Sequence, residues 1–337
     1  MNGVTVTLGA QAPGCREHDG RELRRQSMAQ ALVIDVIFDA IGAINREYVE
    51  VGFNVNEQCA GSGANTCALW RQGWTGLLLD GGHANASINL HTEMVYSHNV
   101  EALLAKYGVS TWPDYVSVDI DSWDLWVVDA LLRSYRPRLL SVEYNPNIPW
   151  RFSLTYPDAS MMRTAGEDRV QHSGVYRGGC FYGASARAID MLSRAHGYEV
   201  VAVVPPLDMF MVPAQLAERA RHALRTGKLN AFAADNGDVR QRLRDGEMLN
   251  AYKYSQWMTA EQAHEMIDFG EWQKRRRSDE NGSVALEAAR RAALDQLSAL
   301  GRMWAWLGVE QMLPKTGGGE YDGPSDESRA RVKSRGD

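Results

Sequence analysis

Strand-like and helix-like segments alternate through the first 213 residues, and this order constrains the fold more than any other feature. The strand-like stretches are 48–53, 76–80, 88–97, 115–121 and 136–145. The helix-like stretches between and after them are 21–45, 99–108, 122–135 and 184–197. Such alternation predicts an α/β fold with a doubly wound, mostly parallel sheet. Residues 198–213 (YEVVAVVPPLDMFMVP) predict a hairpin that turns at the Pro-Pro pair. In sheets of this kind, ligands bind beyond the carboxyl ends of the strands.

Composition excludes several classes of function. A net charge of −6 disfavours a nucleic-acid partner, because binding to phosphates needs a surplus of Lys and Arg. No apolar run approaches the ~20 residues of a membrane span, and the first residues do not resemble a secretory signal. The cysteines, including Cys59 and Cys67, fit no zinc pattern. We therefore expect a cytoplasmic protein with reduced cysteines and no membrane partner.

Changes in composition and periodicity along the chain divide it into four parts. Residues 1–20 predict a disordered N-terminus, 21–213 the α/β domain, 214–313 a helical extension, and 314–337 a disordered tail. One apolar stripe marks the extension: Leu294, Leu297, Leu300, Trp304 and Leu307. This stripe must be buried against the domain or against its own copy, and symmetric pairing favours a homodimer through the C-terminal helices.

The loop after the first strand is the first candidate site. It is rich in glycine, yet it lacks the G-x-G-x-x-G turn that a dinucleotide pyrophosphate needs. Asp80 ends the second strand, where a carboxylate can accept hydrogen bonds from two ribose hydroxyls. S-adenosylmethionine (SAM) has a ribose but no phosphate, so a looser loop would suffice for it. The alternative, that the glycines only permit a surface turn, stays open.

Paired acids define the second candidate site. Asp119 and Asp121 end one strand, and Glu143 and Asn145 end the next. Residues two apart share a face of a strand, so these four side chains would converge if the strands are neighbours. Oxygen ligands of this kind suit Mg²⁺ or Mn²⁺. Alternatively, one acid caps the following helix and another pairs with an arginine.

Seven short motifs follow one another along the chain: YVEVG (48–52), NT (65–66), GWTGLLLD (73–80), VDIDSWDLW (118–126), RPRLLSVEYN (136–145), YGAS (182–185) and FMVP (210–213). In these motifs the chain resembles the FkbM-type family of class I SAM-dependent methyltransferases. The motifs occur in the family's order between Arg21 and Pro213.

The resemblance implies a Rossmann-like sheet of seven strands whose last strand is antiparallel. It also implies a set of cofactor-binding residues: Glu50, Gly52, Asn65, Thr66, Asp80, Gly81, Ser97, Asn99 and Asp119. Asp119 and Asp121 would face the sulfonium and are the candidate catalytic residues. Enzymes similar to catechol O-methyltransferase hold a metal at the same two strand ends, which suggests Asp121, Glu143 and Asn145 as metal ligands.

Two functions follow. The first is SAM-dependent transfer of a methyl group to a hydroxyl of a small molecule, assisted by a divalent metal ion. The second is a non-catalytic, methyltransferase-like protein that serves assembly, because the loop FNVNEQCAGSGANT is longer than in relatives and lacks their Asp-Gly pair.

Overall fold

A computed structural model describes most of the chain. The described residues are 20–59, 65–145, 148, 150–161, 183–204, 208–226, 266–276 and 282–306, and side chains are described from residue 29 except at 283 and 300–306. Among these residues, no helix is both long enough and apolar enough to cross a membrane.

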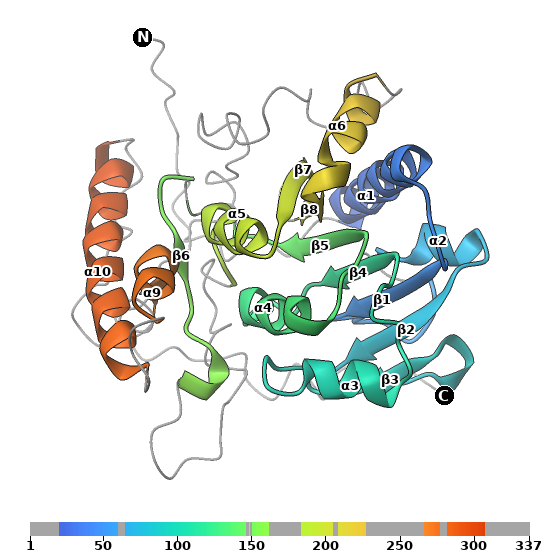
Figure 1. The fold of residues 1–337 in the computed structure, drawn as a ribbon, viewed down its shortest axis with the longest axis horizontal. Coiled ribbons are helices and arrows are strands. Elements are labelled where there is room, and N and C mark those ends of the chain that lie inside the picture. Colours follow the sequence, from blue (N-terminus) through green and yellow to red (C-terminus); the bar gives the residue numbers. More distant parts are fainter. Residues whose placement is uncertain are drawn as a thin grey trace, which may run out of the picture.

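The centre of the molecule is a seven-stranded sheet in the order β3-β2-β1-β4-β5-β8-β7 (Figure 1). Its strands are β1 (Glu47–Val51), β2 (Thr75–Asp80), β3 (Leu90–Thr92), β4 (Tyr115–Val118), β5 (Leu139–Glu143), β7 (Tyr198–Val204) and β8 (Asp208–Pro213). β1 pairs in parallel with both β2 and β4, whereas β8 is antiparallel to β5 and β7. The predicted parallel sheet and the predicted hairpin of 198–213 are both confirmed. The predicted strand over 88–97 is wrong in extent, because only Leu90–Thr92 pairs with β2.

Helices cover both faces of the sheet. α1 (Gly20–Ile41), α2 (Cys67–Arg71) and α6 (Ala217–Thr226) lie on one face, around a core that includes Tyr48, Tyr115 and Phe210. α3 (Val100–Lys106), α4 (Asp124–Ser134) and α5 (Ala186–Ala195) lie on the other. Side chains of successive strand residues pack into the cores on opposite faces of the sheet, because side chains alternate along a strand with a period of two. In β5, for example, Leu139 faces α1, and Leu140 faces α4.

The described part of the predicted extension packs against the same domain. β9 (Ile267–Asp268) pairs with β6 (Leu154–Thr155), and α9 (Phe269–Arg275) and α10 (Ser283–Trp306) follow. Figure 1 shows α9 and α10 beside β6, on the side of the molecule away from β3. The indole ring of Trp272 lies 6.0 Å from that of Trp126 on α4.

The face of α10 that is buried differs from the predicted stripe. Leu297 is buried, as expected, but Leu294 is 38% exposed. The positions that contact the core are Ala285, Ala289, Ala293 and Leu297. Small alanines serve here because they allow α10 to lie close to its neighbours. The side chains of Leu300 and Trp304, and the whole of Leu307, lie outside the described residues.

Candidate functional site

The end of β1 closely approaches the end of β4. Gly52 has φ of +96°, and a Cβ at this position would lie 1.6 Å from the backbone oxygen of Asp119. Both facts restrict the position to glycine, because other residues add a Cβ and rarely adopt this conformation. The glycine thus brings the loop after β1 against the acidic end of β4.

Glu50 anchors the far side of that loop. Its Oε1 accepts a hydrogen bond from the backbone N–H of Asn65 (2.9 Å), and its Oε2 accepts from the N–H of Thr66 (3.0 Å) and from the Thr66 hydroxyl. The Asn65 amide also donates to the Ser117 hydroxyl (2.9 Å). Burial raises the pKa of Glu50 to about 7, although these hydrogen bonds favour the charged form. The structure therefore brings together three predicted cofactor residues, and the Glu50 carboxylate is engaged in holding the loop.

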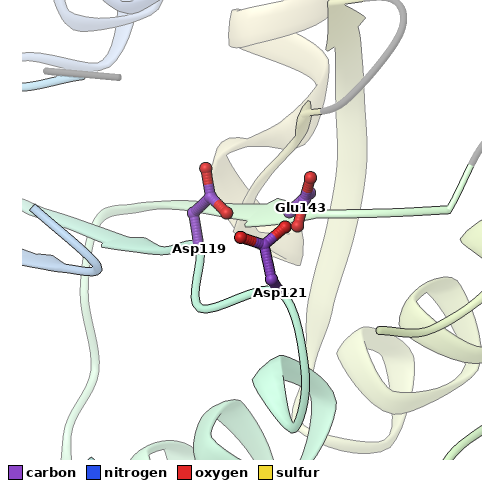
Figure 2. Close-up of side chains that lie close together, drawn as sticks. All are labelled: Asp119, Asp121 and Glu143. Carbon is purple, nitrogen blue, oxygen red and sulfur yellow. The ribbon is translucent and has the colours of Figure 1, made fainter. Parts of the chain in front are cut away.

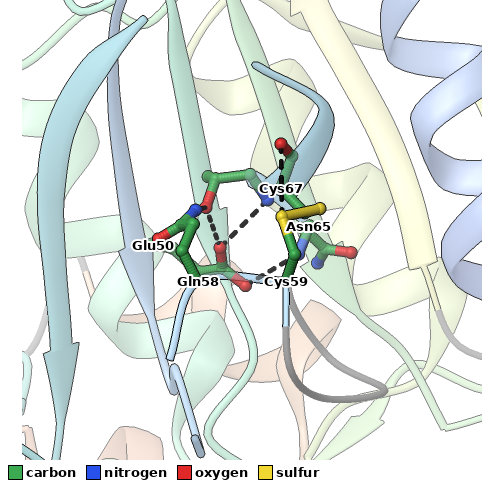
Figure 3. Close-up of a disulfide and its surroundings, with 6 residues drawn as sticks. Glu50, Gln58, Cys59, Asn65 and Cys67 are labelled. Atoms are coloured by element: carbon green, nitrogen blue, oxygen red, sulfur yellow. Dashed lines mark hydrogen bonds between the residues drawn. A yellow bond between two sulfur atoms is a disulfide. The ribbon is translucent and has the colours of Figure 1, made fainter. Parts of the chain in front are cut away.

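A disulfide joins Cys59 to Cys67 across the same loop (Figure 3). The expectation that the cysteines are reduced is wrong for this pair. Their eight-residue separation resembles no zinc motif, but their Cα atoms lie 5.0 Å apart, close enough for the bridge. Two cysteines flanking a glycine-rich loop are the signal in the sequence that could have revealed the bridge.

Asp80 ends β2 with one carboxylate oxygen fully engaged. Oδ1 accepts from the backbone N–H groups of Gly82 (2.7 Å) and His83 (2.9 Å), and it lies 2.6 Å from the His83 Nδ1. These contacts fix the orientation of the carboxylate. At Gly81, a Cβ would lie 2.6 Å from the Met94 Sδ, which places the segment after β3 beside this turn. His83 is a residue of the site that sequence reasoning missed.

The segment after β3 is ordered by one of its own predicted site residues. The Asn99 Oδ1 accepts from the Tyr96 N–H (2.7 Å), and its Nδ2 donates to the Met94 carbonyl (2.8 Å). Asn99 precedes α3, but its side chain does not cap that helix. Ser97 lies between these bonded residues and is half-buried. Asn99 therefore shapes the segment after β3, and the role of both residues in binding a cofactor stays a prediction.

Three carboxylates gather at the ends of β4 and β5. Oxygen atoms of Asp119, Asp121 and Glu143 all lie within 4.8 Å of one another, and Figure 2 shows the three groups side by side. Glu143 is buried and its Oε2 has no hydrogen-bond partner, whereas Asp121 is exposed and has φ of +58°. The predicted convergence of these acids is thus present.

Desolvation raises the pKa of each acid in the cluster, and at Asp119 and Glu143 the repulsion of neighbouring acids raises it further. Desolvation is the largest cause at Asp119, followed by the negative charges of Asp121 and Asp208. At Glu143, desolvation is again the largest cause, followed by the charges of Asp119 and Asp121. Glu143 also forms a hydrogen bond with Asp119, which requires a proton on one of the two carboxyl groups.

Two more acids of this region were missed from the sequence. Asp124, at the start of α4, accepts hydrogen bonds from the N–H groups of Ile120 (2.7 Å) and Ser122 (2.9 Å). The Asp124 carboxylate therefore orders the turn after β4, a role that the run DIDSWD (119–124) could have suggested. Asp208 is the register partner of Glu143 on β8, and Gln30 of α1 donates to it. Burial raises the pKa of each of these two acids to about 7.

No positive charge among the described residues compensates this acidic edge. The charged side chains that contribute most to the pKa shifts of these acids are themselves acids. In the described part of the chain, neither arginine pairs with this cluster: Arg136 donates to backbone carbonyls, and Arg138 donates to backbone carbonyls and pairs with Asp114. Asn145, the remaining predicted metal ligand, is fully buried two residues beyond Glu143, where its backbone pairs with Ser185. An edge with this charge is suited to a cationic ligand.

The strand order, with one antiparallel strand inserted between β5 and β7, defines a Rossmann-like sheet of the class I methyltransferase type. No protein-family model and no curated protein sequence matches the chain.

Two solved structures are similar to this chain. One is an O-methyltransferase from Bacillus cereus in complex with SAH, at 14% identity and a TM-score of 0.32, covering 60% of this chain and 84% of that one. The other is an O-methyltransferase family protein from Burkholderia thailandensis, at 14% identity and a TM-score of 0.30, covering 58% of this chain and 60% of that one. Similarities this low carry no argument about function, so the class of the fold rests on the strand order itself.

Proposed function

We propose that this chain is a SAM-dependent methyltransferase, of the FkbM-type group that its motifs resemble, acting on a hydroxyl of a small molecule. One observation carries the proposal. The glycine turn after β1, Asp80 at the end of β2 and a cluster of uncompensated acids at the ends of β4 and β5 lie along one edge of a class I sheet. That edge is where such sheets bind their ligands.

The residues present fit SAM better than a dinucleotide. Asp80 ends β2 with its hydrogen bonds to the following loop made through Oδ1, which supports a role for the carboxylate as a partner of ribose hydroxyls. Gly52 permits close approach of a ligand to the backbone. A sulfonium is a cation and would be stabilised by Asp119 and its neighbours, whereas a pyrophosphate would be repelled by them.

The acidic cluster also fits a divalent cation. Asp121, Glu143 and Asn145 would supply oxygen ligands, and the unpartnered Oε2 of the buried Glu143 is the kind of atom that a cation would satisfy. A bound Mg²⁺ or Mn²⁺ would lower the pKa of an acceptor hydroxyl and orient its oxygen.

The chain's own residues would position the reactants and take up the proton. When bound, SAM supplies a methyl group on a sulfonium, and the transfer forms a carbon–oxygen bond as the carbon–sulfur bond breaks. If no metal is bound, Asp119 or Asp121 would accept the proton that the acceptor hydroxyl loses, since a raised pKa makes each a stronger base than an ordinary aspartate. The buried ends of β4 and β5 would keep these groups in place.

We also propose a class of acceptor and an oligomeric state. The negative charge of the chain supports a small-molecule acceptor rather than a nucleic acid. A homodimer through α10 is supported by Val284 and Leu294, two large apolar side chains that stay exposed on that helix. A cytoplasmic location and the division of the chain at Pro213 both stay predictions.

A second candidate is a non-catalytic protein with the same fold. It is favoured by the loop after β1, where Glu50 holds the chain itself and the Asp-Gly pair of relatives is missing. The uncompensated acids oppose it, because a cluster of buried carboxyls destabilises a fold unless a ligand uses it.

Calorimetric titration with SAM tests the proposal. Asp80→Ala should weaken SAM by about 1–3 kcal/mol, the range for hydrogen bonds to a charged group. Asp295→Ala, at an exposed position on α10, is the matched control and should leave affinity unchanged. Equal affinity in both variants would place the ribose elsewhere. If the protein binds SAM but keeps full transferase activity after exhaustive chelation with EDTA, the metal part of the proposal fails.

A further inference from the structure

The disulfide between Cys59 and Cys67 links two ends of the candidate cofactor loop. Hydrogen bonds to the sheet hold the Cys67 end, and fewer contacts hold the Cys59 end. Both cysteines are half-buried, so a small reductant can reach the bond. Cys67 begins α2, and Cys59 lies seven residues after Gly52 along the chain.

The Cys67 side is held by the sheet whether or not the disulfide exists. The two residues before it, Asn65 and Thr66, are bonded to the buried Glu50 carboxylate, and Asn65 is bonded again to Ser117. Figure 3 shows this anchor directly beside the bridge. Breaking the disulfide would leave these contacts in place.

The Cys59 side depends more on the bridge. Cys59 has φ of +65°, a conformation that costs energy for a residue with a Cβ and that needs its surroundings to impose it. Its neighbour Gln58 reaches Thr66 only through a long contact of 3.5 Å, and the Asn56 carbonyl accepts one hydrogen bond from Asn85 (2.7 Å). Without the bridge, the strained turn at Cys59 is free to relax.

We propose that Cys59–Cys67 is a redox switch, oxidised for tight binding of SAM and reduced for weak binding. The inference rests on the proposed function, which makes the loop after Gly52 part of the SAM site. In the reduced form, residues leading to Cys59 would have to be ordered when the ligand binds, and this cost lowers affinity. The fold would persist, because Glu50 still holds Asn65 and Thr66.

The chemistry is thiol–disulfide exchange with a dithiol reductant. A thiolate of the reductant attacks one sulfur of the bridge, the bond between the Cys59 and Cys67 sulfurs breaks, and a mixed disulfide forms. The second thiol of the reductant then displaces the remaining protein sulfur. Two electrons and two protons pass to the protein, which ends as two thiols, while the reductant ends as a cyclic disulfide.

The test uses the full chain with Cys15→Ser and Cys180→Ser, so that only the bridged pair can react. Alkylation and intact-mass measurement should label no thiol before treatment with dithiothreitol and two thiols after it. Calorimetry should show that reduction weakens SAM by about tenfold, the factor that corresponds to ordering the backbone of roughly one residue. Reoxidation should restore the affinity, and circular dichroism should show that the reduced protein stays folded.

A matched variant separates the switch from other effects of the reductant. With Cys59→Ser and Cys67→Ser added, SAM affinity should be low and insensitive to dithiothreitol. Equal SAM affinity in the oxidised and reduced protein, or two thiols labelled before any reduction, would overturn the switch and leave the proposed function intact. Absence of SAM binding in both redox states would overturn the proposed function itself.

Discussion

Glu50→Gln tests how the cofactor loop is anchored, and its cost should depend on pH. Burial raises the pKa of Glu50 from its ordinary value of 4.5 to about 7 in the folded protein. The folded state therefore binds this proton more tightly than the unfolded state does. The resulting stability is fully present below pH 4.5 and is lost as the pH rises through 7.

The size of the pH-dependent change in the free energy of unfolding follows from the linkage between folding and proton binding. A pKa difference of one is worth about 1.36 kcal/mol, so the whole contribution is about 3 kcal/mol, of which about 2.5 kcal/mol disappears between pH 5 and pH 8. Glutamine does not titrate and lacks this contribution at every pH. Glu50→Gln should therefore destabilise the protein by about 2.5 kcal/mol more at pH 5 than at pH 8.

Urea unfolding of the ligand-free protein at the two pH values measures this difference. Glu47→Gln is the matched control, because it makes the same change at the other end of β1, where the side chain is half-buried and accepts from the Ser110 N–H. A cost of Glu50→Gln that is equal at both pH values, or larger at pH 8, would refute the reasoning that burial governs this carboxyl group.

Two further variants test the frame that holds the site. Gly52→Ala should destabilise the protein by several kcal/mol and abolish SAM binding, because its Cβ would overlap the Asp119 backbone. Gly73→Ala is the control, because Gly73 is also at positive φ but its Cβ would have no atom within 4 Å; it should cost only about 1 kcal/mol and leave SAM binding intact. Unfolding measures the stability of both variants, and calorimetry measures their affinity for SAM. Asp129→Asn should cost about 3 kcal/mol at pH 7, because that carboxylate is bonded to His196 and lies 3.3 Å from Arg276. Although burial alone would raise the pKa of Asp129, the hydrogen bonds from His196 and Arg133 lower it. Its contribution is therefore present above an ordinary aspartate pKa and lost in strong acid, so urea unfolding should show that the cost of Asp129→Asn shrinks as the pH falls below about 4.

The sheet was predictable because its signals are local. Apolar runs such as GLLLD and YVSV mark buried parallel strands, and Pro205-Pro206 marks the turn of the hairpin. The acids at the ends of β4 and β5 were predictable for the same reason, since the carboxyl ends of neighbouring parallel strands share one edge. The proximity of Asp119 and Glu143 could therefore be predicted without knowing any contact between distant segments.

The features that were missed depend on contacts between distant segments. Leu154 pairs with Asp268, and Asp208 receives a hydrogen bond from Gln30, across 178 positions of sequence. No periodicity within either segment encodes such a contact. Likewise, Leu294 belongs to the predicted apolar stripe of α10 but is exposed, because the helix buries the face that carries Ala285, Ala289 and Ala293 instead.

The central claim is that the carboxyl edge of the sheet binds SAM, and titration of the oxidised protein with SAM and NAD at neutral pH tests it most directly. We expect saturable binding of one SAM per chain and no measurable binding of NAD, because the loop lacks a phosphate turn and the edge is acidic. Binding of NAD, or no binding of SAM to folded and oxidised protein, would contradict the claim.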